Sequence, residues 1–70
     1  MEFGNYFKDA RKQAGLTQKQ VAQKLCIHQS NVSDWENNIS RPDYEKLIEL
    51  AKIYEMTIEE LLGIPELLGF

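Results

Sequence analysis

Cysteine is nearly absent from this sequence, which has only Cys26 among its 70 residues. A single cysteine cannot form a disulfide within the chain, and no cluster of Cys and His has the spacing of metal ligands. Long apolar runs are also missing. The N-terminus has no signal-peptide core, and no stretch approaches the roughly 20 residues that span a bilayer. The sequence therefore predicts a cytoplasmic protein without metal, other cofactor or membrane anchor.

Runs of Gly, Ser or Pro are absent as well, and 43% hydrophobic with 27% charged residues is a globular composition. A chain this short buries only about 60% of its unfolded surface, so we expect one domain with no cavity for a sizeable ligand. An enzyme is disfavoured. The one histidine and the one cysteine lie two positions apart in a turn, and they form no nucleophile–base–acid set.

Positive charge is scarce overall, since the formal net charge is −3, but it is unevenly distributed. Residues 1–41 contain six basic and four acidic side chains, whereas 42–70 contain two basic and seven acidic ones. The two halves thus carry net charges of +2 and −5. A net negative charge disfavours binding to nucleic acid, but the positive net charge of the first half keeps nucleic acid as a candidate partner.

Apolar spacing predicts three helices in the first half of the chain. Helix 2–14 ends before Gly15 and turns one face inward through Phe3, Phe7, Ala10 and Ala14. Helix 17–24 begins at a T-x-x-Q capping box and has an apolar face made by Val21, Ala22 and Leu25. After a tight break, helix 28–37 directs Val32 and Trp35 inward and leaves its other faces polar.

Two further helices are expected in the second half. Pro42 and the N-cap candidate Asp43 open a fourth helix, whose apolar face comprises Leu47, Leu50, Ala51 and Tyr54. A second capping box at Thr57 opens a fifth helix, which ends at Gly63. No segment alternates with period two, so the predicted fold is all-α, with a domain over 1–63 and a short apolar tail over 64–70.

Two short helices joined by about three residues, the second of them polar on one side, form a helix-turn-helix arrangement. The segments GLTQKQVAQKLCIHQSNVSDWENN and RPDYEKLIELAKIYEMTIEELLG resemble the helix-turn-helix domains of the phage repressor and Cro type, the XRE-like family. The resemblance spans 3–63. It implies a compact five-helix, lambda-repressor-like domain that binds double-stranded DNA. It further implies a transcriptional regulator, usually a homodimer on a two-fold symmetric operator.

The third predicted helix is then the base-reading element. Its polar residues can donate and accept hydrogen bonds at base edges, and Gln pairs bidentately with adenine. Asp34 accepts from cytosine but is repelled by phosphates, so it is expected to set specificity rather than add affinity. His28 stands where the family usually has a capping Ser or Thr, and DNA contact and a solvated turn remain equal alternatives for it. The candidate base-reading residues are Gln29, Ser30, Asn31, Asp34 and His28.

Backbone phosphates are expected to meet a second set of residues. Gln18 lies in the first turn of its helix, where free N–H groups and the helix dipole attract an anion. Arg11 and Glu36 match a family pair that ties the first helix to the third, so Arg11 is expected to be structural first. The phosphate candidates are Gln18, Lys19, Arg11, Asn38 and Arg41.

Three positions depart from the family pattern. Cys26 replaces a usual Gly in the turn, which implies strain if that position needs a positive φ. Asn38 also stands where Gly is common, and Asn tolerates the left-handed region more easily. Ile39 replaces a frequent Lys and removes one phosphate contact. These departures lower the expected affinity for DNA.

Two further questions stay open at this point. Either the apolar side chains of the fifth helix and tail form a dimer interface, or they simply cover the core; they are Ile58, Leu62, Ile64, Leu67, Leu68 and Phe70. The second question is function itself. The alternative to a DNA-binding regulator is a protein-interaction module that kept the fold and lost DNA binding, which overall acidity and Ile39 favour slightly.

Overall fold

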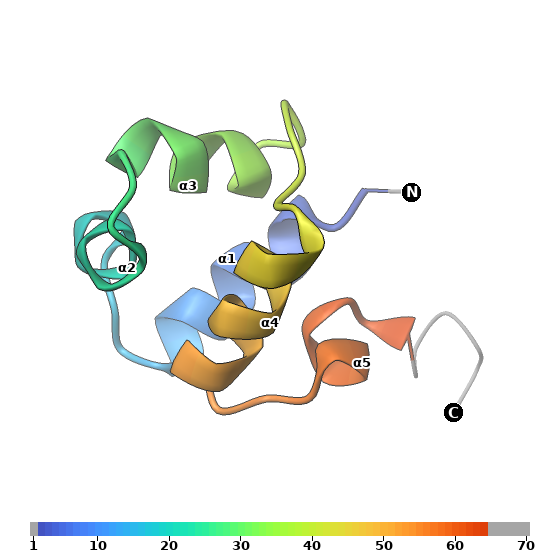
Figure 1. Ribbon diagram of the computed structural model, residues 1–70. Coiled ribbons are helices and arrows are strands. Elements are labelled where there is room, and N and C mark those ends of the chain that lie inside the picture. The colour runs from blue at the N-terminus through green and yellow to red at the C-terminus, as the bar shows by residue number, and fades with distance from the viewer. Residues whose placement is uncertain (1, 65–70) are drawn as a thin grey trace.

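The computed structural model describes residues 2–64, which fold into five α-helices without a strand (Figure 1). The helices, in chain order, are α1 (Gly4–Gln13), α2 (Gln18–Leu25), α3 (Gln29–Glu36), α4 (Tyr44–Ile53) and α5 (Ile58–Leu61). The predicted all-α class and the order of five helices are confirmed. Within the described residues, no helix has the length and apolar content needed to cross a membrane.

Side-chain caps fix the start of three helices. The Thr17 and Thr57 capping boxes both form, and each threonine hydroxyl accepts a hydrogen bond from the backbone N–H three residues on. Asp43 caps α4 in the same way, since its carboxylate accepts from the Lys46 N–H at 2.8 Å. Such caps satisfy N–H groups that have no partner inside the helix. All three predicted starts are confirmed.

The first helix is shorter than predicted. It begins at Gly4, with Phe3 at the N-cap, and Ala14 is the C-cap residue. Ala14 is exposed, so its prediction as an inward-facing residue is wrong. The apolar spacing continues through position 14, but the regular helix has already ended at Gln13, and Gly15 turns the chain with a φ of 73°.

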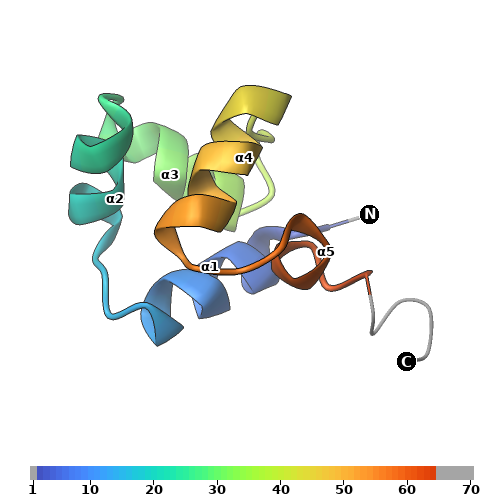
Figure 2. The same ribbon diagram turned by 60° about the horizontal axis from the view of Figure 1, so that its bottom comes forward.

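One hydrophobic core joins all five helices. Val21, Val32, Leu50 and Leu61 are its largest fully buried side chains, and Trp35 is only 7% exposed. Helix α3 lies along one side of the domain, at the top of Figure 1, with α4 below it, and both views place α5 near α1 (Figures 1 and 2). In closer contact, α3 packs against α1 and α2, while α4 packs against α2 and α5. This packing leaves one side of α3 facing solvent.

Candidate nucleic-acid interface

Helices α2 and α3 form the predicted helix-turn-helix, joined by residues 26–28. The inner side of α3 buries Val32, Trp35 and Glu36, as its spacing requires. At its N-terminal end, the solvent-facing side presents Gln29, Ser30 and Asn31, all exposed, with half-buried Asp34 one turn further along. The side chains predicted to read bases therefore lie on one accessible helix, at the top of Figure 1.

Glu36, at the end of α3, is the centre of a buried polar cluster. Its side chain is 2% exposed, and its two carboxylate oxygens accept hydrogen bonds from Arg11 Nε at 2.7 Å and Arg11 Nη2 at 3.0 Å. A third N–H of Arg11, on Nη1, donates to the Leu16 backbone carbonyl at 3.0 Å. The hydrogen bonds to Glu36, together with the charge of that carboxylate, raise the pKa of Arg11 above its ordinary value. The bidentate pair ties α1 to α3.

Gln18 extends this cluster to the surface. Its Nε2 donates to Glu36 Oε1 at 3.1 Å, and its own Oε1 accepts from Gln29 Nε2 at 3.5 Å. A carboxylate can only accept, so Glu36 orients the Gln18 amide, which in turn orients Gln29. Gln29 is left with one amide oxygen and one N–H for another partner. That donor–acceptor pair matches the major-groove edge of adenine, which offers N7 as acceptor and the N6 amine as donor.

The turn between α2 and α3 contains the expected backbone strain. Cys26 is left-handed, with φ 58° and ψ 42°, so the condition for strain at this position is met. The Cys26 N–H donates to the Gln23 carbonyl, and the Ile27 N–H donates to the Ala22 carbonyl at 3.0 Å. This pair of hydrogen bonds is a Schellman motif, which ends α2 sharply and sets the direction of α3.

His28 is the N-cap residue of α3, but its side chain makes no capping hydrogen bond. The departure from Ser or Thr therefore leaves α3 without a side-chain cap, unlike α2, α4 and α5. The imidazole is exposed beside the equally exposed Gln29. His28 therefore lies on the same exposed surface as the other candidate base-reading residues.

Asn38 has a structural contact that sequence reasoning did not find. Its Oδ1 accepts a hydrogen bond from the Gly4 N–H at 2.9 Å, and so supplies the cap that Phe3, the N-cap residue of α1, does not. Gly4 permits this contact, because a Cβ added there would collide with the Glu36 carbonyl oxygen and crowd Asn38 Oδ1. Asn38 itself is left-handed, with a φ of 62°. Only its amide nitrogen is left available to reach a phosphate.

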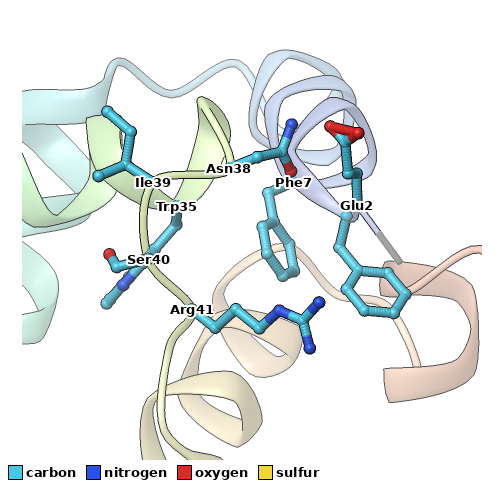
Figure 3. Close-up of a pocket in the computed structure, with 8 residues that line it drawn as sticks. Glu2, Phe7, Trp35, Asn38, Ile39, Ser40 and Arg41 are labelled. Carbon is cyan, nitrogen blue, oxygen red and sulfur yellow. The ribbon is translucent and has the colours of Figure 1, made fainter.

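The loop after α3 borders a cleft of about 250 Å³, whose walls include Phe3, Phe7 and Trp35 (Figure 3). The Arg41 guanidinium carbon lies 5.5 Å from the centre of the Phe3 ring, within the range of a cation–π contact. Arg41 and Ile39 are both exposed on this loop, and Lys19 is exposed in the first turn of α2. The two exposed cations therefore lie on different elements, Lys19 on α2 and Arg41 on the loop that follows α3.

Three of the six predicted dimer candidates lie among the described residues. Ile58 and Leu62 are half-buried and pack against the hydrophobic core, and Ile64 is half-buried too. Leu67, Leu68 and Phe70 lie outside the described residues. The exposed large apolar side chains among residues 2–64 are instead Ile39, Tyr44 and Ile48. The helical periodicity of α4 places Tyr44 and Ile48 away from its inward face, which is the sequence signal for their exposure.

Comparison with known proteins agrees with this geometry. A family model described as helix-turn-helix matches residues 7–61, which include the α2–α3 pair and most of the core. The chain belongs to this helix-turn-helix family. Membership confirms the resemblance to the phage repressor and Cro type, and it places the chain in a family of regulators rather than of enzymes.

Several curated members of the helix-turn-helix family are similar over nearly the whole chain. The HTH-type transcriptional regulator ImmR of Bacillus subtilis is 39% identical over 66 residues, covering 94% of this chain and 52% of that protein. The HTH-type transcriptional activator BcrR of Enterococcus faecalis is 35% identical over 68 residues, or 97% of this chain and 33% of that protein. The chain thus spans about half or less of these relatives.

Proposed function

We propose that this chain is a sequence-specific, double-stranded-DNA-binding domain of a transcriptional regulator, which inserts α3 into the major groove. The observation that carries the proposal is the oriented Gln18–Gln29 pair, held by the buried Glu36. Ordering two amides on the surface costs side-chain entropy, and base recognition is what uses such an arrangement. The names of ImmR and BcrR, both transcriptional regulators, support this assignment.

The assignment of individual contacts follows from their positions. Gln29 reads a base, aided by Ser30, Asn31, Asp34 and His28 along the exposed side of α3. Gln18 and Lys19 at the start of α2, with Arg41 and the Asn38 amide in the loop after α3, meet backbone phosphates. Arg11 has given three of its N–H groups to internal acceptors, so its contribution is to hold α3 in place.

The domain acts as a homodimer in this proposal. Two-fold related helix-turn-helix domains read half-sites about 34 Å apart, one helical turn of B-DNA. Binding of two linked half-sites raises the overall affinity for DNA above that of either domain alone. This gain compensates for the affinity lost because Ile39 replaces a phosphate-binding lysine and because the second half of the chain is acidic. Repression is the simplest mode, because a domain seated in the groove at a promoter occludes that DNA from polymerase.

Selection of bound duplexes from a random pool at about 150 mM salt tests the proposal, since this salt weakens non-specific phosphate binding. The proposal expects enrichment of a two-fold symmetric site with half-sites about 34 Å apart. A folded Gln29→Ala chain in a parallel selection serves as control and enriches that site poorly. If folded wild-type protein enriches no sequence, the domain is instead a protein-interaction module and the proposal is wrong.

A further inference from the structure

Helix α4 has an outward face that the domain leaves uncovered. Tyr44 is 86% exposed and Ile48 is 44% exposed, which makes them two of the large apolar side chains facing solvent among residues 2–64. They lie four positions apart and therefore share one side of the helix. Single exposed apolar residues are common, but a tyrosine and an isoleucine stacked on one helix face form a small apolar stripe.

Charged residues of both signs border this stripe. Glu45 and Lys52 are exposed and lie seven positions apart, two helical turns, so they occupy one side of α4 next to Tyr44 and Ile48. Glu49, also exposed, lies at the outer edge of the same face and lines a shallow cleft with Lys24 and Lys52. Two lysines of its own chain therefore lie along the same cleft as Glu49.

We propose that this face, Tyr44, Glu45, Ile48 and Lys52, binds the same face of a second copy of the chain, with the two α4 helices antiparallel. A two-fold interface must be self-complementary, so that each residue meets the same partner twice. An antiparallel pair centred next to Ile48 places Glu45 of each copy opposite Lys52 of the other, and brings the two Ile48 side chains together. A parallel pair would place like charges opposite each other.

The same pattern favours a second copy over an unrelated protein. An unrelated protein would need only charges complementary to Glu45 and Lys52, at any spacing. Here Glu45 and Lys52 lie at nearly equal distances on either side of Ile48, which is the spacing that an antiparallel pair of identical helices requires. The contact also leaves the proposed DNA-binding side free, because α4 lies below α3 in Figure 1 and does not cover its outer side. The inference rests on the homodimer of the proposed function, to which it adds the surface and the orientation.

The expected dimer is weak. One helix face from each copy buries less than the roughly 1,200–2,000 Å² of stable complexes, so we expect dissociation on the order of 0.1 mM in the absence of DNA. Neighbouring half-sites on DNA would raise the effective concentration of the two copies, and a weak contact suffices there.

Nuclear magnetic resonance of the ¹⁵N-labelled chain without DNA tests this surface independently of its function. Amide shifts are followed between about 20 µM and 1 mM, the range that brackets the expected dissociation constant. We expect concentration-dependent shifts concentrated in residues 41–52. Glu45→Lys or Lys52→Glu should weaken association about tenfold, since each reversal replaces two attractive contacts with two repulsive ones. The double variant Glu45→Lys/Lys52→Glu should recover it.

Glu59→Lys is the matched control, because it makes the same charge change at an exposed first-turn position of α5. It should leave the concentration dependence of the shifts unchanged. Shifts that map to another helix, no concentration dependence up to 1 mM, or a double variant that associates no better than the single ones would each overturn the inference. None of these results bears on DNA binding, which the duplex selection tests separately.

Discussion

Gln18 donates a hydrogen bond from Nε2 to Oε1 of the buried Glu36 at 3.1 Å, and so joins the first turn of α2 to the last turn of α3. The two ends of the helix-turn-helix are thereby locked by one carboxylate, which Arg11 from α1 also holds. Glu36 therefore has two roles: it anchors the fold, and it orients the surface amides of Gln18 and Gln29.

Arg11→Met should destabilise the domain by about 3 kcal/mol, because it leaves the Glu36 carboxylate buried with only Gln18 as partner. The double variant Arg11→Met/Glu36→Leu should recover part of this loss, since it removes the uncompensated charge as well. Urea denaturation followed by circular dichroism measures both. A cost of Arg11→Met below about 0.5 kcal/mol, typical of a surface pair, would contradict the role assigned to this cluster.

Cys26→Gly should stabilise the domain by about 1 kcal/mol, because glycine adopts the left-handed conformation without the clash that a Cβ causes. In a domain of this size, that gain corresponds to a rise in Tm of about 4–8 °C. Cys26→Ala retains the Cβ and serves as control. Equal Tm values for the two variants, measured by thermal denaturation in reducing buffer, would show that backbone strain at this turn is not the cause.

Alkaline pH should destabilise the domain through Tyr54. Burial raises the pKa of this phenol well above its ordinary value of 10, and the nearby Glu36 carboxylate adds to the increase. The folded state therefore keeps the proton that the unfolded state loses, and stability falls as the pH rises above about 10, by up to about 1.4 kcal/mol per pH unit. Urea denaturation of wild type and Tyr54→Phe at pH 8 and pH 11 isolates this contribution. A phenylalanine variant with the same loss of stability at pH 11 would assign the effect to other groups.

The helix starts and the core were predictable because their causes are local. Capping boxes act within four residues, and the spacing of Val21, Val32 and Leu50 follows from helix geometry alone. The cap that Asn38 supplies to Gly4 joins residues 34 positions apart, so only the packing of α1 against α3 brings them together. The Gln18–Glu36 contact likewise depends on tertiary packing, in this case of α2 against α3. Family resemblance placed Gln18 at a phosphate, but it could not show which acceptor orients the amide.

The uncovered stripe on α4 also has a local signal in the sequence, because Tyr44 and Ile48 lie at outward positions of the helical period. The inward positions of α4, from Leu47 to Tyr54, account only for the side that faces the core. The dimer candidates Ile58 and Leu62 are half-buried and pack against this core, so their apolar character already has a use within the domain. Apolarity alone does not separate an interface from a core; the exposed fraction of the folded side chain does.

Binding of the selected duplex and of a scrambled duplex, measured by fluorescence anisotropy at about 150 mM salt, tests most directly whether α3 reads bases. Gln29→Ala should weaken binding of the selected duplex by about 10–100-fold and leave the scrambled duplex unaffected, because it removes a bidentate base contact and no charge. Gln23→Ala, at an exposed position of α2, should change neither affinity. A Gln29→Ala chain that binds both duplexes as wild type does would contradict the account.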